Sequence, residues 1–217
     1  MNNKNKYFPL LIDLSKYKIL LIGGGSVAAR KVKSLLLFNG NITVLAINVC
    51  EKINKLGEEN LIKIIIKNFE KDDINDYDII FSTIDDIDTS RIISESASEK
   101  KKLLNSADIP ELCDFILPAN IIRGPLTFSI ASQGTAPFYV KFLKDKFSEQ
   151  IPAKFEKIAN LAAGFRQKVL ELSNISEQDK KAYYDKFLKV KWEDIPDETF
   201  DLESERIINS IIKGTDG

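Results

Sequence analysis

The 217-residue chain contains no histidine, one methionine, one tryptophan and two cysteines. Because histidine is absent, the sequence excludes Ser–His and Cys–His nucleophilic pairs, imidazole proton shuttles and His-ligated metal centres. The two cysteines, Cys50 and Cys113, form no CxxC pair, so we expect neither a disulfide framework nor a thiolate zinc site. This cysteine usage favours a reduced, cytoplasmic setting. Any proton chemistry falls to Asp, Glu, Lys, Tyr or water.

Long hydrophobic runs and an excess of one charge are also missing. No segment reaches the roughly 18 uninterrupted apolar residues of a membrane span, and the first residues lack the apolar core of a signal peptide. The net charge of −1 gives no reason to expect nucleic acid as a partner. Since 44% of the residues are hydrophobic, the chain is able to bury a core. We expect a globular protein that binds neither a membrane nor nucleic acid.

The first half of the chain alternates strand-like and helix-like segments. An apolar run at 18–22 stops at three glycines, a helix-forming segment follows, and a β-branched strand at 41–46 completes a βαβ unit. Further strands are predicted at 61–69, 77–84 and 103–107, with helices around 49–59 and 88–100. This alternation predicts an α/β fold with a Rossmann-like, mostly parallel sheet covered on both faces.

The pattern changes near Pro110. Two strand-like segments, 115–123 and 126–132, are joined by Gly124-Pro125 and predict an antiparallel pair. From Ala136 onward, apolar residues recur three or four apart, which is typical of helices. We therefore expect three domains: a nucleotide-binding domain at 1–112, a small α+β domain at 113–150 and a helical domain at 151–217.

The three glycines open a nucleotide-binding fingerprint. Gly23-x-Gly25-x-x-Ala28 follows a strand and begins a helix, as in dinucleotide-binding folds, where free N–H groups at the helix N-terminus face a pyrophosphate. The alternative is a tight strand–helix turn with no ligand. The acidic residue that usually holds the ribose hydroxyls is absent about 20 residues on, where Ile47 and Asn48 stand instead. This position leaves the choice between NAD and NADP open.

Four segments then follow one another along the chain: YFPLLIDLSKYKILLIGGGSVAARK, STIDD, NSADIPELCDFILPA and LTFSIASQGTAPFYVKFLKDKF. From about residue 6 to about residue 190, the chain resembles the precorrin-2 dehydrogenases of sirohaem synthesis. That family includes stand-alone dehydrogenases, bifunctional dehydrogenase–ferrochelatases and the N-terminal half of trifunctional sirohaem synthases. The resemblance implies oxidation of precorrin-2 to sirohydrochlorin with NAD as hydride acceptor. It also implies that 113–150 is a dimerisation domain, in a homodimer with the active site near its interface.

The resemblance assigns roles to particular residues. Asp108, just past the last predicted parallel strand, matches the family's acid–base residue, and a carboxylate is a reasonable base where no histidine exists; the alternative is a turn contact before Pro110. Ser132 matches a serine at the mouth of the tetrapyrrole site, or is a turn-forming residue. The family's nucleotide-contacting positions and the crevice after the fourth strand give the cofactor-binding candidates Gly23, Gly24, Gly25, Ser26, Val27, Ile47, Asn48, Thr83 and Asp85.

Charge is unevenly spread in the C-terminal part. Residues 141–191 carry 12 basic and 7 acidic groups, whereas residues 192–217 carry 2 and 8. Precorrin-2 carries eight carboxylates, so basic side chains near the basic stretch are substrate-binding candidates, or else form a solvated helix face. The candidates are Arg123, Lys141 and Lys144. Whether the acidic segment 193–205 docks on the basic stretch is left open.

Two other functions compete with a simple dehydrogenase. A bifunctional enzyme would also insert iron into sirohydrochlorin at the same site, but the absence of histidine removes the commonest iron-guiding side chain. A non-catalytic nucleotide- or tetrapyrrole-binding module would keep the fold without the chemistry. No resident metal is expected in either the leading hypothesis or the non-catalytic alternative.

Overall fold

The computed structural model describes residues 6–107, 109–173 and 175–214. The chain divides into two compact units, with the boundary between Leu117 and Pro118. The finer division of the second unit at residue 150 stays a prediction. In the part of the chain that the structure describes, no helix has the length and apolar character needed to cross a bilayer.

The first unit is built on a five-stranded sheet in which every neighbouring pair is parallel. The strand order is β3-β2-β1-β4-β5, so the order reverses between β1 and β4. This arrangement confirms the predicted Rossmann-like sheet and opens a crevice at the carboxyl ends of β1 and β4. The strands are β1 (Lys18–Ile22), β2 (Asn41–Ala46), β3 (Lys63–Ile66), β4 (Ile79–Ser82) and β5 (Leu103–Ser106).

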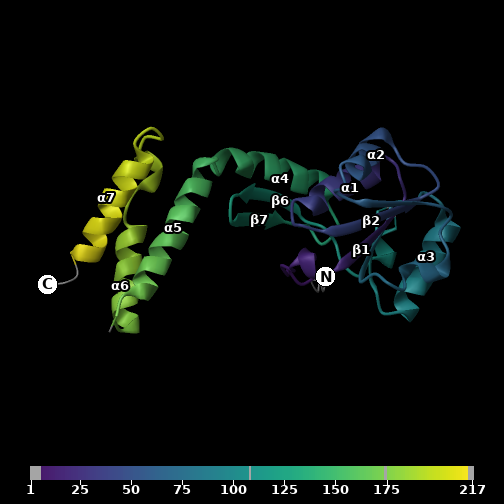
Figure 1. The fold of residues 1–217 in the computed structure, drawn as a ribbon, viewed down its shortest axis with the longest axis horizontal. Coiled ribbons are helices and arrows are strands. Elements are labelled where there is room, and N and C mark those ends of the chain that lie inside the picture. The colour runs from purple at the N-terminus through teal and green to yellow at the C-terminus, as the bar shows by residue number, and fades with distance from the viewer. Residues whose placement is uncertain (1–5, 108, 174, 215–217) are drawn as a thin grey trace. The chain divides into compact units, whose positions relative to one another are not determined.

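Helices cover both faces of this sheet (Figure 1). They are α1 (Ser26–Leu36), α2 (Glu51–Glu58) and α3 (Ile87–Glu99). On one face, Ile19 and Leu21 pack with Val32 of α1 and Ile53 of α2, and all four are fully or almost fully buried. On the other face, alternate residues of β1 pack with Ile93 of α3. The alternation follows from the two-residue period of a strand, and it explains why β1 is apolar throughout.

The second unit combines a hairpin with four helices. β6 (Ala119–Arg123) and β7 (Leu126–Ile130) pair antiparallel, as predicted. The helices are α4 (Pro137–Gln150), α5 (Lys154–Glu171), α6 (Glu177–Leu188) and α7 (Phe200–Lys213). α7 lies in the predicted helical domain 151–217, although no separate helix was predicted there. α5, α6 and α7 pack against one another side by side (Figure 1).

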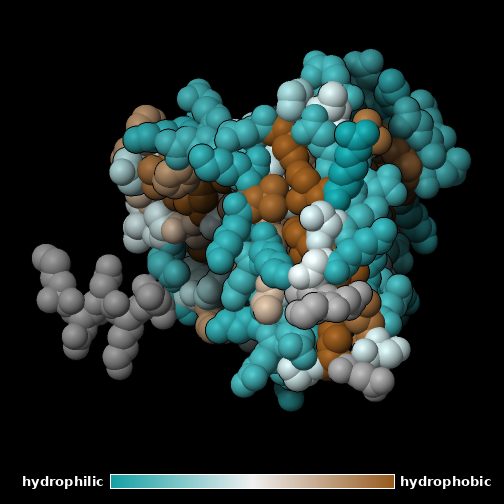
Figure 2. All heavy atoms as spheres, turned by 90° about the vertical axis from the view of Figure 1, so that its left-hand side faces the viewer, coloured by the Kyte–Doolittle hydropathy of each residue, from teal (hydrophilic) through white to brown (hydrophobic). Residues whose placement is uncertain are grey.

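An aromatic core holds α5, α6 and α7 together. Phe165 of α5 stacks on Phe187 of α6 with ring centroids 4.9 Å apart, and Trp192 lies 4.7 Å from Phe187. Phe200 and Ile208 bring α7 into the same cluster. Figure 2 shows the helical end of the chain, where hydrophobic side chains form a stripe between hydrophilic surfaces.

The acidic segment before α7 docks on the basic stretch through α5. The Lys154 ammonium donates to the carbonyl oxygens of Glu193 and Ile195, and Lys157 pairs with Asp197 at 3.3 Å. These contacts answer the question that the charge pattern left open. The acidic residues around 193–205 hide the apolar spacing that begins at Phe200, so no separate helix was predicted there.

Candidate functional site

A pocket of about 400 Å³ lies where the carboxyl ends of β1, β2, β3 and β4 meet. It brings together five of the predicted cofactor-binding residues, which come from three separate loops: Gly23, Gly24, Ile47, Asn48 and Thr83. Parallel strands place the loops that follow them at one sheet edge, so residues far apart in the sequence meet there. The remaining wall is made of Ile22, Leu45, Ala46, Lys67, Asn68, Phe69, Ile84, Asp86 and Thr89.

Contacts with neighbouring loops explain the first two glycines of the turn. Gly23 has φ +118°, and a Cβ there would lie 2.9 Å from the Thr83 carbonyl oxygen. A Cβ on Gly24 would overlap the Asn48 carbonyl oxygen. The Gly24 carbonyl accepts a hydrogen bond from the Cys50 N–H at 2.8 Å, which ties the turn to the start of α2. The fold itself therefore requires glycine at both positions.

Gly25 differs, because nothing in the protein requires glycine there. Its backbone is extended, at φ −83° and ψ −168°, and no atom lies within 4 Å of the position of an added Cβ. It is the N-cap of α1, without a side chain to accept the N–H groups of the first turn. The open space and the free donors of residues 26–28 form the anion-binding arrangement in which a pyrophosphate approaches the backbone.

The end of β4 supplies the opposite wall of the pocket. Thr83 donates through its hydroxyl to the Ile22 carbonyl at 3.1 Å, which joins β4 to β1 at the point where the strand order reverses. Asp86 caps α3 by accepting from the Thr89 N–H at 2.8 Å, and hydrogen bonding to Thr89 holds the pKa of Asp86 below its ordinary value. Asp86 therefore lines the pocket as a carboxylate at neutral pH.

A second pocket of about 500 Å³ adjoins the end of β4. Its lining residues are Ile84, Asp85, Ile87, Ser90, Arg91, Ile109 and Leu112. Asp85, predicted to contact the cofactor, lies here and not beside the glycines. Asp108 lies outside the described residues, but its sequence neighbour Ile109 lines this pocket, and the Ala107 N–H donates to the Ser82 carbonyl at 2.9 Å.

The predicted substrate-binding residues belong to the second unit. Arg123 donates to the carbonyls of Ile151 (2.7 Å) and Ser148 (3.1 Å), so its guanidinium fastens β6 to the end of α4. The Ser132 hydroxyl accepts a hydrogen bond from the Ala136 N–H at 2.9 Å, which is the turn contact expected as its alternative role. Two further candidates, Lys141 and Lys144, lie one turn apart on α4.

Several residues of the two pockets were not singled out from the sequence. Lys67, Asn68 and Phe69 follow β3, and Thr89 and Arg91 lie in the first turns of α3. The signal that identifies them is their place after a parallel strand, at the edge that already carries the glycine turn. Among the described residues, no three His, Cys, Asp or Glu side chains gather in a group that would hold a metal ion.

Comparisons with known proteins agree with this site. A family model described as "Putative NAD(P)-binding" matches residues 10–119. A protein named siroheme synthase from Ruthia magnifica is 34% identical over 181 residues, which cover 83% of this chain and 38% of that protein. Another siroheme synthase, from Psychrobacter cryohalolentis, is 35% identical over 159 residues, covering 73% of this chain and 30% of that protein. The chain thus spans between a quarter and a half of the length of the relatives that it matches.

A solved structure shares the fold. It is titled "SirC, precorrin-2 dehydrogenase", and it superposes with a TM-score of 0.74 at 22% sequence identity. The match covers 95% of this chain and 100% of the other. The likeness therefore includes the Rossmann-like sheet, the hairpin and the C-terminal helices.

Proposed function

The chain belongs to the NAD(P)-binding family whose model matches residues 10–119, and from this premise we propose that it is an NAD-dependent dehydrogenase that oxidises precorrin-2 to sirohydrochlorin. Support comes from the siroheme synthases that it resembles over most of its length and from the fold that it shares with a precorrin-2 dehydrogenase. The observation that carries the proposal is the open N-terminus of α1 at Gly25, directly after the two glycines that line the pocket at the carboxyl edge of the sheet.

The residues of the first pocket fit a dinucleotide. The free N–H groups at the start of α1 would hold the pyrophosphate, and Asn48 is placed at the end of β2 where a ribose hydroxyl needs a polar partner. Bound NAD would supply the hydride acceptor. The protein's own contribution is to hold the nucleotide at the carboxyl edge of the sheet, next to the pocket that Ile109 lines.

The proton needs a separate acceptor. Oxidation of precorrin-2 releases one hydride, which reduces NAD to NADH, and one proton. We assign the proton to the carboxylate of Asp108, following the family resemblance and the absence of histidine from the chain. Arg91, which lines the second pocket, is a cation suited to the substrate's carboxylates. In the second unit, the guanidinium of Arg123 is engaged with backbone carbonyls, and Lys141 and Lys144 stay predicted substrate ligands.

A homodimer fits an otherwise unexplained face of α4. This 14-residue helix has no buried residue, and four of its aromatic side chains are exposed: Phe138, Tyr139, Phe142 and Phe147. Such a row of exposed aromatic rings suits a protein partner, and a second copy is the partner that the resemblance implies. Light scattering after chromatography tests the dimer, and Phe138→Ser/Phe142→Ser should shift it to monomer.

The proposed cytoplasmic setting rests on two free cysteines, Cys50 and Cys113.

The deciding experiment is anaerobic incubation of the purified chain with precorrin-2 and NAD. We expect NADH absorbance to grow with the wild-type chain. Asp108→Asn should bind NAD with unchanged affinity and lose turnover, since the amide keeps the shape of the side chain but is not a base. NAD binding without any NADH formation by the wild-type chain would favour the non-catalytic module. Full turnover by Asp108→Asn would move the base to another group.

A further inference from the structure

The outer end of the cofactor pocket lacks the residue that usually selects the nucleotide. In dinucleotide-binding folds, an acidic residue at the end of β2 holds the ribose 2′-hydroxyl of NAD, while a nearby cation accepts the 2′-phosphate of NADP. Here Asn48 occupies the end of β2, and it carries no charge with which to repel a phosphate. Selectivity between the two nucleotides must therefore come from residues outside β2.

Lys67 directly follows the neighbouring strand β3, level with the end of β2. Its N–H donates to the carbonyl of Ala46, the last residue of β2, at 3.1 Å, and its side chain lines the pocket together with Ile47 and Asn48. An unpaired ammonium at this place would be a ready partner for a 2′-phosphate. By position alone, Lys67 favours NADP.

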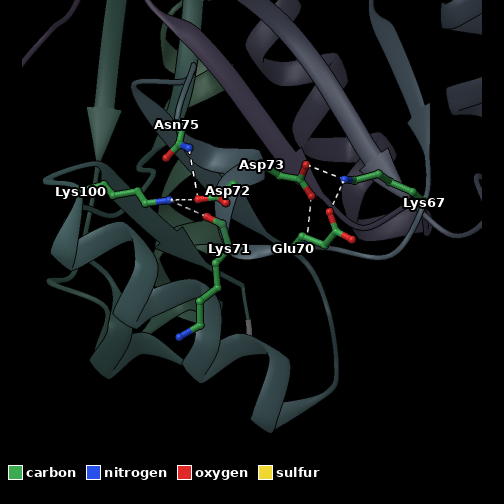
Figure 3. Close-up of polar contacts among 7 residues, drawn as sticks. All are labelled: Lys67, Glu70, Lys71, Asp72, Asp73, Asn75 and Lys100. Atoms are coloured by element: carbon green, nitrogen blue, oxygen red, sulfur yellow. Dashed lines mark hydrogen bonds and ion pairs between the residues drawn. The ribbon is translucent and has the colours of Figure 1, made fainter.

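The ammonium of Lys67 is already held by two carboxylates. Its Nζ lies 2.8 Å from Asp73 Oδ1 and 3.0 Å from Glu70 Oε2, as Figure 3 shows. Asp73 is itself fixed, because its second oxygen accepts from the Glu70 N–H at 2.9 Å. Hydrogen bonds to Asp73 and Glu70 raise the pKa of Lys67, so the amine stays protonated. One cation and two carboxylates give this bridge a net charge of −1, at the place where Lys67 borders the pocket.

We propose that Glu70 and Asp73 make the pocket selective for NAD over NADP by holding Lys67 in a bridge of net negative charge. In other nucleotide-binding domains, an acidic residue at the end of β2 disfavours the 2′-phosphate of NADP. Here the two carboxylates that follow β3 take that role. A 2′-phosphate would have to displace a carboxylate from Lys67 and then lie beside it, whereas the 2′-hydroxyl of NAD meets no such repulsion. This inference rests on the proposed function, since it takes the pocket to hold the nucleotide.

The test compares the dissociation constants of NAD and NADP by isothermal titration of the whole chain. The variant Glu70→Gln/Asp73→Asn keeps both hydrogen-bonding side chains and removes both negative charges. We expect the ratio of NADP to NAD affinity to rise about tenfold or more, the effect of one charge-assisted hydrogen bond made available to the phosphate. If the role of the bridge is purely structural, the variant should bind both nucleotides more weakly, with the ratio of the two affinities unchanged.

The same turn offers a matched control. Asp72 pairs with Lys100 at 3.1 Å, on the other side of the turn from Lys67 (Figure 3), so its charge lies outside the Lys67 bridge. Asp72→Asn removes one negative charge from the same segment, and it should leave the ratio as in the wild-type chain. A complementary variant, Lys67→Gln in the Glu70→Gln/Asp73→Asn background, should lose the NADP affinity gained there.

The outcomes separate this inference from the proposed function. Wild-type preference for NADP, or an unchanged ratio in Glu70→Gln/Asp73→Asn, would overturn the selectivity mechanism while nucleotide binding stands. An equal rise in Asp72→Asn would show that general charge, and not the bridge, sets the preference. If the wild-type chain binds neither nucleotide, the proposed function fails and the selectivity mechanism fails with it.

Discussion

Replacing Gly25 by Asp should separate cofactor binding from folding. Gly25 has an extended backbone and open space around its Cβ position, so a side chain meets no clash. It is also the N-cap of α1, where Asp is better than Gly by roughly a few tenths of a kcal/mol. The variant Gly25→Asp should therefore fold with unchanged or slightly higher stability.

The same carboxylate would stand where the pyrophosphate approaches the first turn of α1. Two unit charges about 4 Å apart repel by about 4 kcal/mol at an effective dielectric constant of about 20, which corresponds to roughly a thousandfold in affinity. The carboxylate also competes for the N–H groups that the phosphate needs. Allowing for solvent screening, we expect NAD affinity to fall by at least about a hundredfold.

The assay pairs NAD titration with thermal unfolding. Gly25→Asn is the matched control, since it caps the helix as well as Asp but carries no charge. It should keep more NAD affinity than Gly25→Asp at equal stability. By contrast, Gly24→Ala should lower the melting temperature, because its Cβ overlaps the Asn48 carbonyl. If Gly25→Asp bound NAD within about threefold of wild type, the pyrophosphate site would not be at this helix end.

Three further predictions concern the second unit. Phe165→Ala should cost about 3–5 kcal/mol of unfolding free energy, because Phe165 is 2% exposed and stacked on Phe187; denaturant unfolding measures it. Trp192→Phe should cost about 1–3 kcal/mol in the same assay, because the indole N–H bond to the Phe187 carbonyl (2.9 Å) is lost in a buried place. Hydrogen bonds from the Ser176 hydroxyl and N–H lower the pKa of Asp179. The cap therefore stabilises the fold fully above the unfolded pKa of about 3.9, and this stabilisation is lost as the pH falls through the lower folded pKa. Ser176→Ala should raise the Asp179 pKa in a carboxyl NMR titration, and an unchanged value would contradict the role of the hydroxyl.

The sequence predicts the first unit well because its signals are local. The βαβ unit around the glycine turn was placed to within a few residues, since apolar runs, glycine and β-branched residues agree there. The strand predicted at 61–69 is shorter in the structure, Lys63–Ile66, because its last residues leave the sheet to line the pocket. Lys67 fell within the predicted strand, although the strand ends one residue before it.

The sequence predicts less where a residue's partner is distant along the chain. Arg123 looked like a carboxylate ligand, but three carbonyls, of Ile122, Ser148 and Ile151, hold its guanidinium. The bridge at Lys67 was missed for another reason: its partners Glu70 and Asp73 are near in sequence, but the strand predicted at 61–69 gave no turn to bring them together. The roles of the substrate-binding candidates and of Asp108 stay predictions.

The contacts that force glycine at positions 23 and 24 have a consequence for binding energetics. Protein groups at the ends of β1, β2 and β4 surround the turn: the Gly23 N–H donates to the Leu45 carbonyl, and Thr83 and Asn48 leave no room for a Cβ at the two glycines. A receptor shaped in advance loses little conformational entropy when its ligand arrives. The Gly23 and Cys50 N–H groups, which are hydrogen-bonded within the protein, should therefore exchange slowly before NAD is added, and the turn should bind the nucleotide without closing around it.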